Sequence, residues 1–352
     1  EGVTHAATGD EVVAPGALMR LAGEQLHRDE FLANGIPWPL HMGETCLCVG
    51  GRPVPLGSIT ADGGTAWLPW DLETGDHAAL LFRDGTASTP ATAKVRPYAP
   101  GIFPGAVIRA GSLCRATAEN GVRPGEVFEV YATGLGPGAP SWMPPSVSIN
   151  GLPAEVLYSG TLDSLVGLNQ VNLRVHPQTP PAKRSDLELR VGEAVTRYPV
   201  GVSGPEDRFG IALAGSPAEV VVQAGGPAAI QQVWLEGRNG YCGPVLLSAE
   251  GPAGVTIRAP VGMTDQSVPV EIRAAPSVPP QSGSEVSLRG HAPGVIAGAA
   301  TLRLTVLAGL GDIRVRVVSG GFTALPLARF DWNGRTLYST AGGGAGRGIN
   351  VL

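Results

Sequence analysis

Apolar and polar residues alternate with a period of two in many short segments of this chain. Val171, Leu173 and Val175, for example, alternate with Asn172 and Arg174. The same pattern recurs at residues 187–191, 268–272, 302–306 and 313–317. Successive side chains of a β-strand point to opposite faces, so each segment predicts a strand with one face in a core and the other in water.

Helical periodicity is scarce by comparison. The best candidate, residues 23–34, predicts at most a turn or two of helix. Gly (51) and Pro (32) are abundant among the 352 residues, which suits many short strands joined by tight turns. A hydrophobic content of 43% argues against disorder. Together these features predict an all-β protein, long enough for about two to four domains that each bury a core.

Three pairs of stretches correspond, in the same order, in the first part of the chain. They are residues 14–22 with 123–131, 49–56 with 149–156 and, more loosely, 67–70 with 174–177. In the first pair a Pro-Gly turn opens a strand. In the second, a turn between two β-rich runs is typical of a hairpin. The near-constant spacing predicts a tandem duplication, with its seam in the Pro- and Gly-rich residues 95–105.

The pattern changes beyond residue 203. Residues 204–308 contain about seven strand-like segments, the number found in an immunoglobulin-like sandwich. We therefore predict an all-β fold of tandem immunoglobulin-like β-sandwich domains with a β-rich C-terminal tail. The domains are expected at residues 1–97, 98–203 and 204–308, and the tail at residues 309–352.

Three stretches of the second unit carry a family resemblance. They are residues 124–137 (PGEVFEVYATGLGP), 147–160 (VSINGLPAEVLYSG) and 167–175 (GLNQVNLRV). In this order they resemble the Solibacter-type uncharacterised C-terminal domain, across residues 107–203. The first unit resembles the same family through residues 14–16, 51–56 and 68–72. It departs from the pattern at residues 23–26 (GEQL), where the second unit has ATGL.

The rest of the chain carries two further resemblances. Residues 209–307 are similar to bacterial immunoglobulin-like repeats, through GYCGPVLLS (residues 240–248) and GPAGV (residues 251–255). The tail resembles the interleukin-like EMT-inducer domain through residues 319–322, 331–334 and 346–351. These resemblances imply export, β-sandwich folds and modules appended to larger surface proteins. They imply no catalytic residues and no cofactor.

Charge and hydropathy narrow the range of partners. The formal net charge is −5 and no run of five or more Lys or Arg occurs, which argues against nucleic acid. No apolar stretch reaches the roughly 18 residues of a membrane span. The first residue is Glu1 rather than Met, which fits a mature exported chain as well as a trimmed one. We therefore expect an extracellular or cell-surface location.

The four cysteines are Cys46, Cys48, Cys114 and Cys242. Cys46 and Cys48 share one face of a predicted strand. The chain lacks the paired C-x₂₋₄-C spacing of a zinc site. Two interpretations stay open: buried small hydrophobic residues, or at least one disulfide in an exported protein. The sequence does not give the pairing.

Recognisable catalytic and metal-binding motifs are missing from the sequence. Residues 134–136 form a G-x-G, but the prolines of residues 137–145 predict a turn rather than the helix of a dinucleotide site. The acidic turns at residues 62–64 and 163–164 lack the D-x-D-x-D-G run of a calcium loop. The six histidines form no H-E-x-x-H pair, and no G-x-S-x-G elbow occurs. We expect no enzyme activity, no metal and no cofactor.

The tryptophans are the remaining candidates for an interaction surface. Trp67 and Trp70 flank Leu68-Pro69. Their pair is interpreted either as core or as an exposed platform for a sugar or a neighbouring subunit. Trp142 lies in a proline-rich loop, where burial and exposure are equally supported.

These inferences predict a secreted, non-enzymatic structural protein, the subunit of an extracellular filament or surface assembly held by β-strand exchange. Residues 1–13 or 346–352 would supply the donated strand. The alternative is an adhesin or the carbohydrate-binding module of a larger surface protein. The expected partners are further copies of the chain, other surface proteins or glycans.

Overall fold

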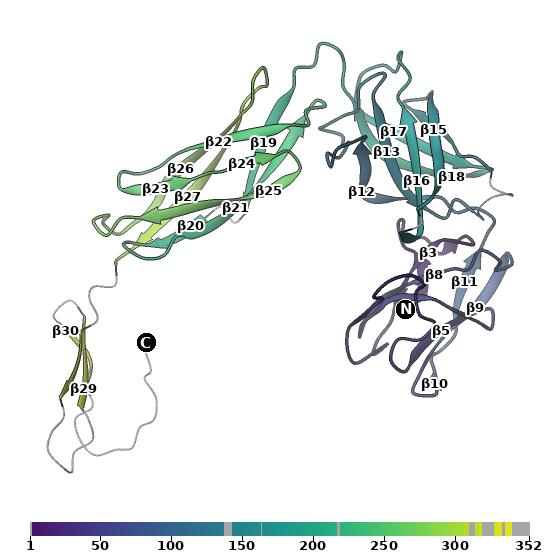
Figure 1. Cartoon of the computed structure of the whole chain (residues 1–352), viewed down its shortest axis with the longest axis horizontal. Helices are drawn as coiled ribbons and strands as arrows, with labels where there is room; N and C mark the ends of the chain where they lie inside the picture. Colours follow the sequence, from purple (N-terminus) through teal and green to yellow (C-terminus); the bar gives the residue numbers. More distant parts are fainter. Residues whose placement is uncertain are drawn as a thin grey trace.

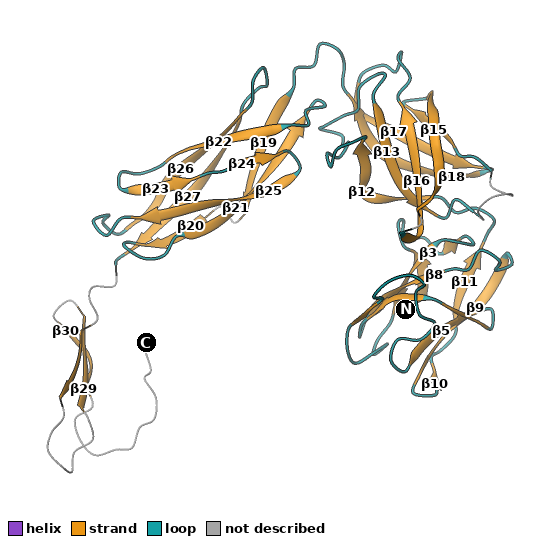
Figure 2. Cartoon of the chain, in the orientation of Figure 1, coloured by secondary structure: helices purple, strands orange, loops and turns teal. Residues whose placement is uncertain are grey.

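The computed structural model describes residues 2–136, 143–162, 164–216 and 219–309, and the backbone of three strands in the tail. Throughout these residues the protein is all-β, with no helix (Figure 2). This confirms the predicted fold class. Three sandwiches follow one another in a bent row, and the tail strands lie beyond the third (Figure 1). The tail strands β28 (Arg314–Val318), β29 (Leu327–Trp332) and β30 (Arg335–Ser339) form one sheet.

The first sandwich packs two sheets around one core. One sheet has the strand order β1 (Gly2–His5), β3 (Leu18–Ala22), β8 (Gly63–Trp67), β7 (Leu56–Ile59) and β4 (Phe31–Leu32). The other has the order β2 (Val12–Val13), β11 (Ala91–Val95), β9 (Gly75–Arg83), β5 (Thr45–Val49) and β6 (Arg52–Val54), with β10 (Thr86–Ala87) paired to β9. The buried cluster between them runs from Val3 to Val95.

The helix expected at residues 23–34 is wrong. Gln25 has a φ of 54°, in the left-handed region that a right-handed helix excludes. Phe31 pairs with Ile59, so this part of the segment is the edge strand β4. The backbone N–H of Leu26 donates to the carbonyl of Ala61 at 2.8 Å. These pairings to distant strands satisfy backbone groups that a helix would have satisfied locally.

The second sandwich is one continuous seven-stranded sheet folded over its core. Its order is β12 (Gly101–Arg109), β13 (Val127–Thr133), β16 (Leu165–Arg174), β15 (Leu152–Leu162), β14 (Ser146–Ile149), β17 (Ala182–Val191) and β18 (Ala194–Val202). Strand β15 joins the two halves because it pairs with β14 at its start and with β16 along the rest. The core cluster runs from Ile102 to Val202.

The third sandwich again has two sheets. One has the order β19 (Gly210–Ser216), β21 (Ala229–Arg238), β25 (Gln266–Ala274) and β23 (Val255–Arg258). The other has the order β20 (Glu219–Gln223), β27 (Gly298–Leu307), β26 (Gln281–His291), β22 (Pro244–Glu250) and β24 (Val261–Met263). Its core cluster runs from Ile211 to Val306. The expected boundaries after residues 97 and 203 fall between the three clusters.

The first and third domains share an immunoglobulin-like way of starting. In each domain the chain first pairs antiparallel in one sheet and then parallel in the other. In the first domain, β1 pairs antiparallel with β3 and β2 pairs parallel with β11. In the third domain, β19 pairs antiparallel with β21 and β20 pairs parallel with β27. Within the expected donor segment, residues 1–13, residues 2–5 and 12–13 are therefore paired in strands of their own domain. The other expected donor, residues 346–352, lies outside the described residues.

The corresponding stretches of the first two domains occupy equivalent strands. Each Pro-Gly turn directly precedes a strand, β3 in the first domain and β13 in the second. The second pair forms the hairpins β5–β6 and β14–β15. Gly50, Gly51, Asn150 and Gly151 have φ values of 58°, 77°, 49° and 78°. Positive φ at both loop positions is the type I′ turn, which Gly-Gly and Asn-Gly favour.

A hydrogen-bonded junction joins the second and third domains. The guanidinium of Arg123 donates to the carbonyl of Asn239 at 2.9 Å. The side chain of Asn120 accepts from the N–H of Gly240 at 2.7 Å and donates to the carbonyl of Tyr241 at 3.2 Å. Because these bonds run from side chains of one domain to backbone of the next, they fix the junction in one arrangement.

Candidate functional site

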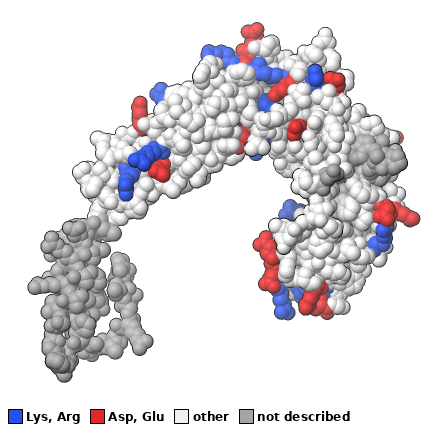
Figure 3. All heavy atoms as spheres, in the orientation of Figure 1, with Lys and Arg blue, Asp and Glu red and all other residues white. Residues whose placement is uncertain are grey.

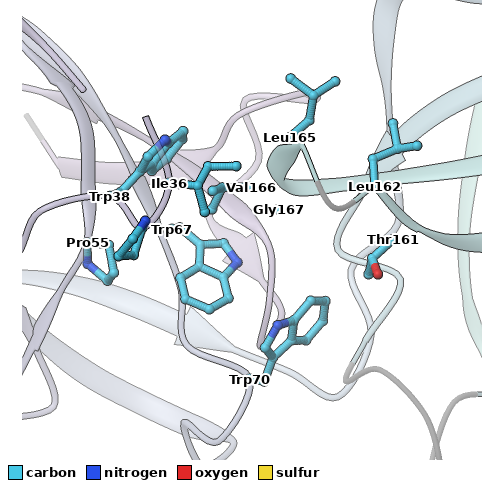
Figure 4. Close-up of a pocket in the computed structure, with 11 residues that line it drawn as sticks. Ile36, Trp38, Pro55, Trp67, Trp70, Thr161, Leu162, Leu165, Val166 and Gly167 are labelled. Atoms are coloured by element: carbon cyan, nitrogen blue, oxygen red, sulfur yellow. The ribbon is translucent and has the colours of Figure 1, made fainter. Parts of the chain in front are cut away.

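A cleft of about 670 Å³ lies where the first two domains meet (Figure 4). Its volume is in the range of about 300–1,000 Å³ typical of ligand sites. The wall from the first domain consists of three indoles with proline and isoleucine side chains: Trp38, Trp67, Trp70, Pro37, Pro55 and Ile36. The wall from the second domain consists of the end of the β15–β16 hairpin: Thr161, Leu162, Leu165, Val166 and Gly167.

Trp70 lies directly on the backbone of Gly16. A Cβ added to Gly16 would overlap the six-membered ring of Trp70, and Gly16 has a φ of 80°. Only glycine meets both conditions without strain. The indole N–H of Trp67 donates to the carbonyl of the same glycine at 3.1 Å. The rings of Trp67 and Trp70 stand edge to face, with centroids 6.1 Å apart.

The rings of Trp38 and Trp67 also lie directly against glycines. A Cβ on Gly57 would lie 2.5 Å from the ring of Trp38. A Cβ on Gly167 would lie 2.9 Å from Trp67 Cδ1. Gly167 belongs to the second domain, so the cleft is closed at this base, where the two domains touch. Three glycines thus hold three half-buried indoles in place before any ligand arrives.

The hydroxyl of Thr133 ties the two walls together. Thr133 Oγ1 accepts from the backbone N–H of Leu18, in the first domain, at 2.9 Å. It donates to the carbonyl of Gly167, in the hairpin of the second domain, at 2.6 Å. Thr133 is fully buried. The hairpin wall is therefore fixed relative to the tryptophan wall.

A buried histidine lies at the same domain junction. His5 Nδ1 accepts from the backbone N–H groups of Ala7 and Thr8 at 3.2 and 3.3 Å, which requires the neutral ring. Burial lowers the pKa of His5, and the carbonyl of Ala99 and the charge of Asp10 oppose this more weakly. The imidazole is therefore neutral in the folded protein near neutral pH.

The cleft is uncharged along its described lining. The indole N–H groups of Trp38 and Trp70 donate to no group within the described part of the chain, whereas that of Trp67 is used. An indole N–H can only donate. Within its described lining, the cleft therefore offers flat aromatic faces, aliphatic side chains, two indole donors and no charged side chain.

Sequence reasoning found part of this site. The structure brings Trp67 and Trp70 together, half-buried, at the edge of the first domain. Trp142 lies outside the described residues. Trp38 was missed, although its position between Pro37 and Pro39 repeats the Trp-next-to-Pro pattern of the predicted pair. No sequence signal marked the hairpin end, because its role depends on how the domains dock.

The structure also places the cysteines. Cys114 and Cys242 form a disulfide across the junction of the second and third domains, with Cα atoms 5.9 Å apart. Cys46 and Cys48 are free, on the outward face of β5. Burial raises the pKa of the Cys46 thiol, and the neighbouring Cys48 adds to the rise.

The residues that the structure describes hold neither a cluster of metal ligands nor a helix that could span a membrane. No group of three or more His, Cys, Asp or Glu side chains there could hold a metal ion. No helix long and apolar enough to cross a membrane occurs among them.

Comparison with known proteins gives folds only. No model of a known protein family matches the sequence, and no curated protein matches it. An endo-fucoidan hydrolase of glycoside hydrolase family 107 is 10% identical, with a TM-score of 0.26, over 85% of this chain and 43% of that chain. This chain thus spans less than half of that enzyme's length.

Two binding proteins are similar to the same degree. The Yersinia pseudotuberculosis adhesin InvE is 12% identical, with a TM-score of 0.21, over 64% of this chain and 66% of that chain. The Bacteroides ovatus protein SGBP-B, from a mixed-linkage glucan utilization locus, is 12% identical, with a TM-score of 0.22, over 91% and 74%. Likenesses of this size carry no information on ligand or activity.

Proposed function

We propose that this chain is an exported, non-catalytic surface protein of the adhesin type, which holds a neutral glycan in the cleft between its first two domains. The observation that supports this proposal most strongly is the set of three indoles, each seated on a glycine, along one wall of the cleft. Positioned aromatic faces next to open solvent are expected at a binding site rather than in a core.

The chemistry of the lining favours a sugar. The face of an aromatic ring is negative and attracts the slightly positive C–H groups that cover the face of a sugar ring. Sugar hydroxyls can accept from the indole N–H groups of Trp38 and Trp70. The described lining has no charged side chain to pair with an ionic ligand. A neutral ligand with apolar faces and a polar edge matches all three properties.

The surroundings of the cleft suit presentation on a surface. The visible face of the molecule carries scattered charges of both signs, with no large patch of one sign (Figure 3). The three sandwiches follow one another in a bent row (Figure 1), and the cleft lies between the first two. Such a row would hold the cleft away from an attachment point at the far end of the row.

The proposal is tested by calorimetry of the full chain against neutral oligosaccharides. Trp70→Ala should weaken binding by about 30-fold, since a buried aromatic anchor contributes about 2 kcal/mol or more. Tyr158→Ala is the control, because Tyr158 is 45% exposed and outside the cleft lining, and it should change nothing.

Either of two results would refute the proposal. One is the absence of binding to any neutral saccharide. The other is an equal effect of the two substitutions. A proline-rich peptide belongs in the same series, because aromatic grooves also bind polyproline helices. Binding of that peptide alone would assign the cleft to a different ligand.

Assembly into a filament by strand exchange is a separate prediction. It needs a strand that is free to leave its own domain, whereas residues 2–5 and 12–13 of the expected donor segment are paired in theirs. Light scattering with negative-stain microscopy tests it. An elongated monomer would remove the filament from consideration, and regular fibres would support it.

A further inference from the structure

We infer that the cleft selects neutral pyranose chains whose ring hydroxyls are all equatorial, of the gluco or xylo type, over those with an axial hydroxyl. This inference rests on the proposed function and names its ligand class. The observation behind it is that the cleft has two opposed apolar walls, rather than one aromatic platform facing water.

The two walls come from different domains. Figure 4 shows Trp67 and Trp70 on one side of the space, with Leu162 and Thr161 across from them. The described lining of the second wall is aliphatic, apart from one hydroxyl, that of Thr161. A ring that enters between the walls meets an indole with one face and aliphatic side chains with the other.

Both faces of the ring must then be apolar. In a β-linked gluco or xylo pyranose, the ring substituents are equatorial, so each face presents only axial C–H groups. A manno ring has an axial hydroxyl at C2 and a galacto ring has one at C4. In the cleft that hydroxyl would be pressed against a wall without a hydrogen-bond partner, which costs roughly 10- to 100-fold in affinity.

The described lining also carries hydrogen-bonding groups for the polar edge of the ring. Equatorial hydroxyls point outward in the plane of the ring, toward the rim of the cleft. An indole N–H also lies in the plane of its own ring. The available donors of Trp38 and Trp70, together with the Thr161 hydroxyl, can therefore serve the edge of a sugar without interrupting either apolar face.

The distance between the walls is set before binding. Thr133 bonds to both domains, and Gly167 brings the hairpin against Trp67 at the base of the cleft. Preorganised walls cannot move apart cheaply to make room for an axial group. Acidic sugars are disfavoured for a related reason, because a carboxylate or sulfate would lose its water with no cation in the described lining to replace it.

Calorimetry with four hexasaccharides tests the inference on the full chain: β-1,4-linked glucose, xylose and mannose, and β-1,3-linked galactose, whose axial C4 hydroxyls are free. The glucose and xylose hexamers should bind within a few-fold of each other. The mannose and galactose hexamers should bind about 10- to 100-fold more weakly. Equal binding of all four would overturn the inference and leave the proposed function intact. Binding of none would overturn both.

A substitution on the second wall gives an independent readout. Leu165 is 50% exposed, so Leu165→Ser should fold normally. Its hydroxyl would offer a partner to an axial group, and the preference for glucose over mannose should fall to a few-fold. Leu113→Ser, at a residue that is 76% exposed and outside the cleft lining, is the control and should leave the preference unchanged. An unchanged preference in Leu165→Ser would show that the second wall does not select the sugar.

Discussion

Replacing Thr133 by valine tests whether one hydroxyl holds the first two domains in register. Valine keeps the shape of threonine and removes both hydrogen bonds of Thr133 Oγ1. The N–H of Leu18 and the carbonyl of Gly167 would lose their partner. A buried polar group without a hydrogen-bond partner costs about 1–3 kcal/mol of stability. These two groups are partly buried, so we take about 1 kcal/mol for each. We expect a loss of about 2 kcal/mol in all; the bond to Leu18, which crosses between the domains, accounts for about 1 kcal/mol of it, or about a 5-fold weakening of docking.

Thr179→Val is the matched control. Thr179 is buried in the same domain, but its Oγ1 has no partner in the described part of the chain. Removing an unsatisfied buried hydroxyl should be neutral or stabilising. The assay is urea unfolding followed by tryptophan fluorescence, because the first domain carries Trp38, Trp67 and Trp70. Equal unfolding midpoints for the two variants would refute the bridging role of Thr133.

Three further predictions concern the junctions and the seats of the indoles. Replacing both Cys114 and Cys242 by serine should lower the free energy of unfolding by up to about 5 kcal/mol, because the disulfide removes loop-closure entropy over a sequence separation of 128 residues. Unfolding in guanidinium measures this loss. No change would mean that the hydrogen bonds fix the junction alone. Burial lowers the pKa of His5, so the unfolded chain binds the extra proton more readily than the folded one. The stability contributed by the neutral ring should therefore be complete above about pH 6.5. It should fall by up to about 1.4 kcal/mol per pH unit as the pH drops toward the folded pKa. Thermal unfolding at several pH values should show a smaller slope in His5→Asn, and an identical slope would contradict the assignment. Gly16→Ala should weaken glycan binding and cost more stability than the about 1–2 kcal/mol of a left-handed alanine, because the added Cβ would also displace Trp70. Gly9→Ala, at a φ of 78° with nothing within 4 Å, should cost that strain alone and leave binding unchanged. Equal binding of the two variants would argue against the contact of Trp70 with Gly16.

The sequence was sufficient for features that depend on near neighbours. Alternation with a period of two requires an apolar face for each strand, and so it predicted strands such as β16 and β17. Gly50-Gly51 and Asn150-Gly151 determine tight turns because few other residues tolerate positive φ at both positions. The Pro-Gly turns and their spacing indicated two similar units in tandem. All of these follow from local sterics and from the need to bury one face of a strand.

Residues 23–34 show the limit of local reasoning. A weak helical pattern there gives way to pairing with β7, because backbone groups of distant strands satisfy the segment better than a short helix would. The same limit applied to the cysteines, whose pairing depends on which domains lie next to each other.

The candidate site was decided by the tertiary structure. Leu18 and Thr133 are 115 positions apart, and their bond exists only because the first two domains dock in one orientation. That docking brings the end of the β15–β16 hairpin opposite the tryptophans and so creates the second wall of the cleft. A sequence determines which side chains are aromatic and which glycines can seat them. The distances across a cleft between two domains are set by the packing of both, and no local pattern encodes them.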